Sequence, residues 1–372
     1  MKILHIADLH LGKKIAGYSL IDDQRYFLDK TILYMNDNDI NHLIIAGDIY
    51  DVTSPSGEAI ELFSNFLVEL KKNKIKAFII SGNHDSSERV GYGSSLFKDS
   101  DIYINSNIKE SINPICVDGI NYYLIPYASA AEINQAFDQE FKTYDEAFRY
   151  LVNLIKLDES KINIAVAHQL VLNGDGTSVL GGSEEPIIGT IQNLSADIFN
   201  KFSYVALGHI HKPQQINEKI RYCGSPLAYH VDESKYAKTY TIINISDNNI
   251  EICLDNIKPL RDVIEIKDTF DNIINNYEEY RNYYVYATII GNEVENAMAK
   301  LKNKYPYAMS LRYLKEEAKD FDITKKISDI ESISNEDLFA KLYLEQKGKE
   351  LSEFQLKLIK KIFGECEKNE TN

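Results

Sequence analysis

The chain opens with Met1-Lys2-Ile3-Leu4-His5-Ile6-Ala7-Asp8-Leu9-His10, and the pattern in this segment recurs along the first two thirds of the sequence. Its apolar run is typical of a buried β-strand, and a carboxylate and an imidazole follow at its end. The same order recurs further along, with apolar runs that end at Asp48, Asn83, His168 and His209. Ligands in open α/β sheets gather outside the carboxyl ends of strands. The recurrence therefore predicts one site assembled from several strand ends.

The bulk composition sets the class of protein. The chain has 372 residues and 44% hydrophobic content, which allows a large core and more than one domain. It lacks the run of about eighteen apolar residues that a membrane span needs. His5 and Asp8 interrupt the first apolar run, which favours a core strand over a signal peptide. The four cysteines form no CxxC pair, so we expect a reduced, cytoplasmic chain.

The net charge of −15 argues against a surface that binds nucleic acid by itself, because such binding rests on lysine and arginine. The acidic excess lies mainly in residues 1–256. Two bound divalent cations would add positive charge to an acidic site. The charge therefore does not exclude a nucleic-acid substrate.

Residues 1–256 alternate short apolar runs with helical patterns. Helices are predicted at Gln24–Asn36 and Glu58–Lys72, where apolar residues recur at helical spacing. The predicted strands are Lys2–Ala7, His42–Ala46, Ala77–Ser81, Tyr122–Pro126, Ile162–Ala167, Tyr204–Leu207, Thr239–Ile245 and Asn249–Leu254. This alternation predicts a layered α/β sandwich.

The pattern changes from about residue 260. A small second α/β module is predicted, and its tyrosines either stack nucleic-acid bases or pack its own core. Its strands are Val263–Ile266, Tyr284–Ile290 and Met309–Tyr313, and its helices are Asp271–Tyr280 and Glu293–Asn303. A polar linker at Asp320–Ser334 precedes two amphipathic helices, the second with Ser352 and Gln355 as a capping box. These helices either pack internally or dock on a partner.

The residues at the strand ends are oxygen and nitrogen donors without a thiolate: Asp8, His10, Asp48, Asn83, His168, His209 and His211. Two metal ions about 4 Å apart need a bridging anion and further ligands for each ion. Asp48 is the best candidate for the bridge. Asp8, His10 and His211 would complete one ion, and Asn83, His168 and His209 the other. Such a set suits Mn²⁺ or Fe²⁺, with Zn²⁺ and Mg²⁺ as alternatives.

His84 follows Asn83 and is not needed as a ligand, so it is the candidate for protonating a leaving oxygen. Asp51 is the carboxylate predicted to orient it, and Asp85 is the local competitor. Each cluster alone is weak evidence, because a lone histidine such as His168 is more often structural. The whole series in this order favours a two-metal hydrolase.

Several of these blocks resemble a known family. Asp8-Leu9-His10-Leu11-Gly12, Gly47-Asp48-Ile49-Tyr50-Asp51, Gly82-Asn83-His84-Asp85 and Gly208-His209-Ile210-His211 resemble the calcineurin-like metallophosphoesterase superfamily. Gly224-Ser225-Pro226 and its surroundings narrow the resemblance to the SbcD-type nuclease subunits of double-strand-break repair. The resemblance implies a two-layered β-sandwich flanked by helices.

The resemblance also implies a domain plan and partners. Residues 1–256 would be the nuclease domain, 257–322 a DNA-capping domain, and 323–372 a linker with helices that dock on an SbcC-like coiled-coil ATPase. The subunit would work as a homodimer, with the helix Glu58–Lys72 near the contact. The chain has no Walker motif for binding ATP, so any ATP dependence would come from the partner.

The implied activity is Mn²⁺-dependent hydrolysis of DNA phosphodiesters, as a double-strand 3′–5′ exonuclease and a single-strand or hairpin endonuclease in repair and recombination. Asp8, His10, Asp48 and His211 would hold one ion, and Asp48, Asn83, His168 and His209 the other, with His84 catalytic. Relatives often carry a histidine at the position of Asp51, so its role rests on the orienting argument. Two alternatives are a stand-alone phosphoesterase acting on nucleotides or phosphoproteins, and a metal-bound scaffold that does not cut.

Overall fold

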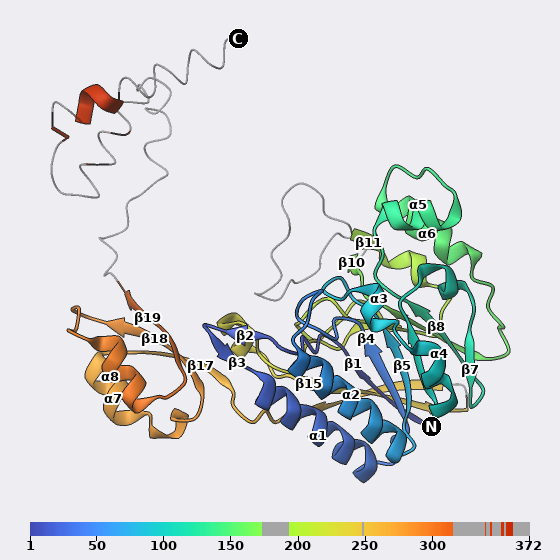
Figure 1. The fold of residues 1–372 in the computed structure, drawn as a ribbon, viewed down its shortest axis with the longest axis horizontal. Helices are drawn as coiled ribbons and strands as arrows, with labels where there is room; N and C mark the ends of the chain where they lie inside the picture. Colours follow the sequence, from blue (N-terminus) through green and yellow to red (C-terminus); the bar gives the residue numbers. More distant parts are fainter. Residues whose placement is uncertain are drawn as a thin grey trace. The chain divides into compact units, whose positions relative to one another are not determined.

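The structure, a computed structural model, describes residues 1–172, 193–247, 249–314, 339, 343, 351–352 and 355–359 (Figure 1). The described residues of Met1–Leu314 form one compact unit, and the later ones belong to a second. The glycine-rich loop Asn173–Gly189 and the predicted linker Asp320–Ser334 lie outside the described residues.

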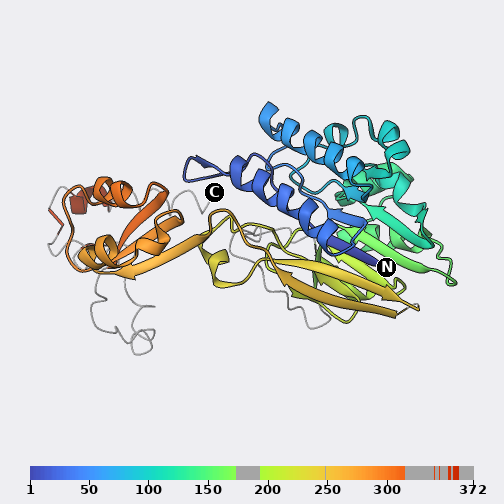
Figure 2. The same cartoon turned by 90° about the horizontal axis from the view of Figure 1, so that it is seen from below.

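The first sheet has six strands, four of them parallel. In spatial order they are β16 (Asn249–Asn256), β15 (Thr239–Ser246), β1 (Lys2–Ile6), β4 (His42–Ala46), β5 (Lys76–Ile80) and β6 (Ile102–Asn105). β15 pairs antiparallel with both β1 and β16. The two helices α1 (Ile21–Asp37) and α2 (Gly57–Lys72) lie side by side along this sheet (Figures 1 and 2).

The second sheet also has six strands, and its central four are parallel. In spatial order they are β13 (Gln214–Gln215), β14 (Ile220–Tyr222), β12 (Tyr204–Leu207), β9 (Ile162–Ala167), β8 (Ile120–Ile125) and β7 (Ile115–Val117). Its outer face packs against α5 (Ala130–Phe137), α6 (Tyr144–Leu154) and the 3₁₀ turn η3 (Ala196–Phe199).

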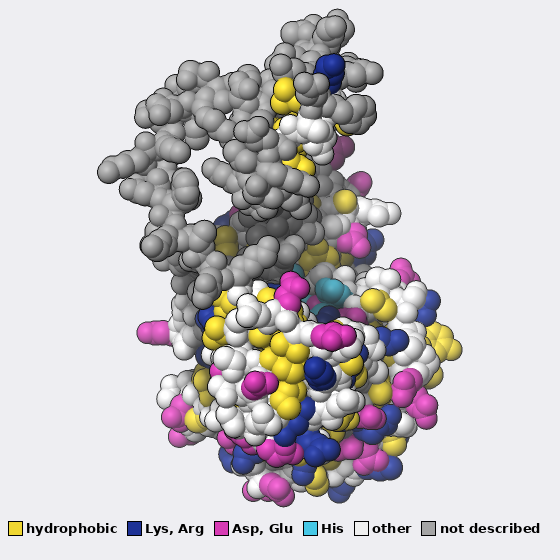
Figure 3. All heavy atoms as spheres, turned by 90° about the vertical axis from the view of Figure 1, so that its left-hand side faces the viewer, with side chains coloured by type: hydrophobic (Ala, Val, Ile, Leu, Met, Phe, Trp, Pro, Cys, Tyr) yellow, Lys and Arg dark blue, Asp and Glu magenta, His cyan; other side chains and the backbone are white. Residues whose placement is uncertain are grey.

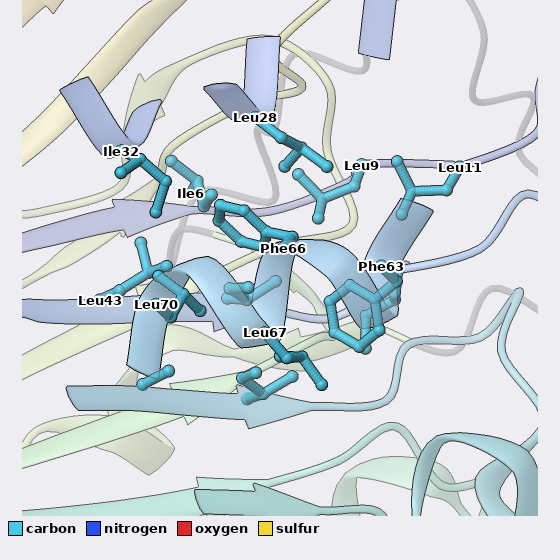
Figure 4. Packing of buried hydrophobic residues seen from close by; sticks show 14 of the residues in the cluster. Ile6, Leu9, Leu11, Leu28, Ile32, Leu43, Phe63, Phe66, Leu67 and Leu70 are labelled. Atoms are coloured by element: carbon cyan, nitrogen blue, oxygen red, sulfur yellow. The ribbon is translucent and has the colours of Figure 1, made fainter. Parts of the chain in front are cut away.

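Three layers of buried side chains hold this sandwich together. One lies between α1, α2 and the first sheet, where Leu28, Phe66 and Leu70 meet Ile6 and Leu43 (Figure 4). A second fills the space between the two sheets, and a third lies under α5 and α6. Central strands are buried on both faces, which explains their continuous apolar runs. The prediction of a two-layered α/β sandwich is confirmed.

Shorter elements connect these strands, and several of them surround the candidate site. They are β2 (Lys14–Ile15), β3 (Tyr18–Ser19), α3 (Ser87–Val90), α4 (Ser94–Phe97), η1 (Lys98–Ser100), η2 (Ile108–Ile112), β10 (Leu170–Leu172), β11 (Asn193–Ser195) and η4 (Val231–Lys235). The sequence analysis did not predict the strands β13 and β14 or the helices α5 and α6.

The small module has a parallel three-stranded sheet in the order β17 (Val263–Asp268), β18 (Tyr284–Ile290) and β19 (Ala308–Leu314). Helices α7 (Phe270–Asn276) and α8 (Ala297–Lys304) and the turn η5 (Glu278–Tyr280) pack on it over a core of their own. The three predicted strands are confirmed. Tyr284 and Tyr305 are buried, so these two tyrosines pack the core and do not offer rings to a base.

Acidic and basic side chains are intermixed on the face that includes the small module (Figure 3). In the second unit, Ser352 and Gln355 exchange the hydrogen bonds of a capping box at the start of helical residues 355–359, as predicted. No described helix is both long and apolar enough to cross a membrane.

Candidate metal centre

Each predicted ligand lies just beyond the carboxyl end of a parallel strand, and the two sheets bring these ends together. Asp8 follows β1, Asp48 follows β4 and Asn83 follows β5, all in the first sheet. His168 follows β9 in the second sheet, and His209 follows β12. Residues more than 200 positions apart in the sequence therefore share one site.

The contacts across the site are short. Asn83 Oδ1 lies 3.0 Å from His168 Nε2 and 3.0 Å from His209 Nδ1. Asp48 Oδ2 lies 3.2 Å from His168 Nε2, which joins the two sheets. On the other side, His10 Nε2 and His211 Nε2 are 3.1 Å apart.

These donors form overlapping groups that suit metal ions. One group is Asp8, His10 and His211, and another is Asp8, Asp48 and His168, with the donor atoms of each within 4.8 Å of one another. Asp48 also groups with His10 and His84. Asp48 therefore lies between the two predicted ligand sets, where a bridging carboxylate would have to be.

The backbone is not extended at four of the candidate ligands, because Asp8, His10, Asp48 and His209 have positive φ angles. The φ angles of Asp8 and His10 are +56° and +44°, and those of Asp48 and His209 are +50° and +95°. Non-glycine residues rarely adopt such angles, and they cluster at functional sites. The side chains of Asp8 and His10 meet because the chain turns tightly between them.

Close approach explains the glycine before His209. A Cβ at Gly208 would lie 1.9 Å from the main-chain oxygen of Ala46 and 2.8 Å from His168 Nδ1. Only a residue without a side chain lets β12 come this close to the end of β4. The same holds for Gly82, where a Cβ would lie 2.2 Å from Asp48 Oδ1.

The site contains two buried carboxylates whose negative charge a bound cation would compensate. Asp8 and Asp48 are almost completely buried, and Asp8 Oδ2 has no hydrogen-bond partner among the described residues. Burial raises the pKa of Asp8 to about 7. Burial also acts to raise the pKa of Asp48, but the charge and hydrogen bond of His168 outweigh it and lower that pKa. Divalent cations fit this arrangement, because they would compensate both carboxylates.

Three of the four candidate histidine ligands are neutral at pH 7 and can offer a nitrogen lone pair to a metal ion. Burial lowers the pKa of His10, lowers that of His209 to about 3 and lowers that of His211 to about 4. These imidazoles are therefore neutral at pH 7, as metal ligands must be. His168 differs, because Asp48 outweighs the effect of burial and raises the pKa of His168 to about 9. A cation bound beside Asp48 would take the place of that proton.

Hydrogen bonds behind the ligands fix two imidazole rings. His168 Nδ1 donates to the main-chain oxygen of Ala46 at 2.7 Å, which leaves Nε2 for the site. His211 Nδ1 donates to Glu233 Oε1 at 3.1 Å, and Lys238 Nζ donates to Glu233 Oε2 at 2.6 Å. A carboxylate behind a histidine ligand is a common orienting device. Sequence reasoning assigned Glu233 no role, although it follows the Gly224-Ser225-Pro226 block closely.

His84 lies at the exposed edge of the site, with its ring centre 4.8 Å from that of His10. Its Nδ1 donates to the main-chain oxygen of Asp51 at 2.9 Å. The prediction that the Asp51 carboxylate orients His84 is therefore wrong, because Asp51 contacts His84 through its main-chain oxygen. That carboxylate instead accepts from Lys13 Nζ at 2.7 Å and lies 3.5 Å from His10 Nδ1.

Asp85, the competing candidate, has another function. Its carboxylate accepts hydrogen bonds from the main-chain nitrogens of Ile49, Tyr50 and Gly82 at 2.9–3.0 Å. Asp85 therefore ties together the loops after β4 and β5, which carry Asp48 and Asn83. It shapes the site without orienting His84.

Comparison with solved structures finds distant similarity. A protein of Thermus thermophilus is 10% identical, and the match covers 69% of this chain and 99% of that one, with a TM-score of 0.41. A dimetal phosphatase from Danio rerio is 12% identical over 69% of this chain and 99% of that one, with a TM-score of 0.41. A cold-active protein-tyrosine phosphatase of Shewanella is 12% identical over 69% and 80%, with a TM-score of 0.27. Similarities of this size do not decide a function.

A family model gives the assignment. The model of the calcineurin-like phosphoesterases matches residues 1–213, which include every predicted ligand and His84. This match covers more than half of the chain, and the clustered carboxylates and imidazoles agree with it. The chain belongs to the calcineurin-like phosphoesterase family.

Proposed function

We propose that this phosphoesterase hydrolyses phosphodiester bonds in DNA, as the nuclease subunit of an SbcC–SbcD-type complex. The observation that carries the proposal is His84, held at the open edge of a buried two-metal ligand set by the carbonyl of Asp51. Family membership supports a phosphoesterase with two divalent metals. The nuclease blocks around Gly224-Ser225-Pro226 and the packed small module support the narrower function.

The roles of the ligands follow from their grouping. Asp8, His10 and His211 would hold one divalent cation, and Asn83, His168 and His209 the other, with Asp48 between them. When bound, the two cations supply Lewis acidity and an activated water. Mn²⁺ suits the mixed oxygen and nitrogen donors. The buried carboxylates and the imidazoles around them would determine where the cations bind.

His84 would act as the general acid that protonates the leaving oxygen. Its Nδ1 hydrogen is committed to the Asp51 carbonyl, so Nε2 is the nitrogen that gives or takes a proton. General acid catalysis of this kind contributes roughly 100- to 10,000-fold to a rate. The Asp51 carboxylate would instead help to orient the imidazole of His10, which it contacts while it pairs with Lys13.

The DNA itself would be held mainly by other parts of the complex. The chain has a net charge of −15, and the face that includes the small module shows intermixed charges (Figure 3). The proposal therefore assigns much of the phosphate binding to an SbcC-like ATPase, reached through residues 323–372, and to a second copy of the subunit. Deleting residues 330–372 should abolish co-purification with such an ATPase; unchanged binding would refute this docking role.

The deciding experiment compares the wild type with His84→Ala in Mn²⁺. The substrates are a linear duplex, a DNA hairpin and a mononucleotide phosphodiester. We expect DNA cleavage by the wild type and a loss of at least roughly 100-fold in the variant. Calorimetric Mn²⁺ binding serves as the control and should be unchanged in His84→Ala. Turnover of the mononucleotide phosphodiester alone would instead favour a stand-alone phosphoesterase and refute the nuclease.

A further inference from the structure

We propose that the small module, Val263–Leu314, is a buttress for the metal centre: it fixes the ligand loop Asp8–Gly12 through Tyr229 and helix α1. The inference rests on the metal-dependent chemistry of the family and does not depend on DNA being the substrate. Two chains of contacts carry it, one polar and one apolar. Both begin at the loop and end in the module.

The loop is held from behind by two buried side chains. Gln24 of α1 donates from Nε2 to the main-chain oxygen of His10 at 2.7 Å, and its Oε1 accepts from Gly12 at 2.9 Å. The Tyr229 hydroxyl donates to the main-chain oxygen of Leu9 at 2.7 Å, and that of Asp8 is 3.1 Å away. Tyr229 also sets its ring edge-on to His10, with 5.3 Å between ring centres. Gln24 and Tyr229 therefore support the loop on the side away from its main-chain hydrogen bonds with the segment after β4.

The polar chain continues from Gln24 to its neighbour Asp23, whose side chain is 1% exposed. Asp23 Oδ2 accepts from Arg261 Nη2 at 2.9 Å and from the Tyr284 hydroxyl at 2.7 Å. Arg261 leads into β17, and Tyr284 begins β18. Consecutive residues of one rigid helix thus hold the ligand loop and the small module.

The apolar chain runs through Tyr229 itself. Tyr229 and Leu227 pack in one buried cluster with Val263, Tyr284 and Met309 of the module. Tyr229 is 4% exposed, so little of its ring meets water. The same side chain that supports the ligand loop is therefore part of the surface on which the module rests.

The loop needs such support because its backbone is strained. Asp8 and His10 have φ angles of +56° and +44°, and residues keep such angles only where their surroundings impose them. Loss of Arg261 would also leave the buried Asp23 carboxylate without its cation. Weakening either chain should let the loop relax and loosen the ligand set Asp8, His10 and His211. Arg261, Tyr284 and Tyr229 are thus positioning residues.

The test measures Mn²⁺ binding by calorimetry on the full chain without substrate, together with turnover of a small phosphodiester. Substitutions behind metal ligands lower affinity by roughly 10- to 100-fold. We expect Tyr229→Phe to lower the affinity for Mn²⁺ by roughly 10-fold. Tyr284→Phe and Arg261→Ala should lower this affinity by less, and Arg261→Lys should keep more of it than Arg261→Ala does. Arg149→Ala, which breaks an exposed ion pair between α6 and Asp197 of η3, is the matched control and should bind Mn²⁺ as the wild type does.

Wild-type Mn²⁺ affinity in folded Tyr229→Phe and Arg261→Ala would overturn the buttress, whatever the effect on turnover. If Arg261→Ala does not fold, Tyr284→Phe carries the test, because it removes a single hydroxyl. Binding is measured without DNA, so failure of the nuclease proposal would leave the result intact. Loss of DNA cleavage with normal Mn²⁺ binding would also overturn the buttress and assign the module to the substrate.

Discussion

Lys238→Met should destabilise the protein far more than its single ion pair suggests. Lys238 Nζ lies 2.6 Å from Glu233 Oε2, and the two side chains are 8% and 0% exposed. Lys238 also donates to Ser225 Oγ at 2.7 Å. Removing one member of a buried pair leaves the other charge uncompensated, which costs about 3–5 kcal/mol. Glu233→Gln should cost a similar amount, because Lys238 then remains as a buried cation.

The double variant Glu233→Gln, Lys238→Met separates the pair from its members. We expect it to cost clearly less than the sum of the single substitutions, with a coupling energy of about 2 kcal/mol. The assay is urea unfolding followed by circular dichroism, with a chelator present so that metal binding does not contribute. Lys72→Met is the control, because Lys72 pairs with Glu69 at 2.7 Å but is 65% exposed. Its cost should stay below about 1 kcal/mol.

Additive single costs, or a cost of Lys238→Met no larger than that of Lys72→Met, would refute this reasoning. Burial and not distance separates the two pairs, since their lengths differ by little. A refutation would also weaken the case that Glu233 fixes His211. In that event the ring of His211 would have to be held by its packing against Tyr229, 5.4 Å between ring centres.

Three further predictions concern the glycines, pH and metal. Gly208→Ala should destabilise the fold by more than about 2 kcal/mol, because its Cβ would overlap the Ala46 oxygen, whereas Gly57→Ala, with open space around it, should be harmless in the same unfolding assay. Burial lowers the pKa of His5 to about 3 from an ordinary 6.5, so on acidification the unfolded state binds a proton at a higher pH than the folded state does. The free energy of unfolding therefore decreases as the pH is lowered. Between pH 7 and pH 5 this should cost about 2 kcal/mol, and His5→Gln should remove that part of the pH dependence; an unchanged slope would contradict it. Chelation should lower the melting temperature reversibly, since Mn²⁺ at a hundred times its Kd stabilises by about 2.7 kcal/mol, and an unmoved melting curve would count against the site.

Strands buried on both faces were the easiest elements to predict. The bounds of β4, β9 and β12 agree with the prediction residue for residue, because each is a short, mostly apolar run that is followed at once by a glycine or a histidine. The helices α5 and α6 were missed although each has a readable signal. Ser129 with Glu132, and Thr143 with Glu146, form capping boxes at their starts. A search for capping boxes would have found both helices.

The candidate ligands could be predicted because they come directly after strands, two each after β1 and β12 and one each after β4, β5 and β9. The residues behind the candidate ligands could not be predicted in this way. Gln24 and Tyr229 reach the ligand loop from a helix and from a turn far along the chain. Nothing in local spacing distinguishes them from core residues. Asp51 shows the same limit, since the sequence placed the right residue beside His84 but could not tell its carbonyl from its carboxylate. Contacts of this kind depend on packing that no single segment contains.

The strained turns also bear on what the metals do for the protein. Asp8, His10, Asp48 and His209 all have positive φ, and each such residue costs roughly 1–3 kcal/mol. Two carboxylates lie buried among them, which adds repulsion when no cation is present. Hydrogen bonds from Gln24 and Tyr229 offset part of this cost without any metal. Main-chain hydrogen bonds and contacts among the candidate ligands, such as His209 N to Asp8 Oδ1 at 2.9 Å, offset a further part, and we expect metal binding to supply the rest. Metal binding and folding should therefore be coupled at this site, and a variant that relaxes the turns should gain stability without metal while losing affinity for it.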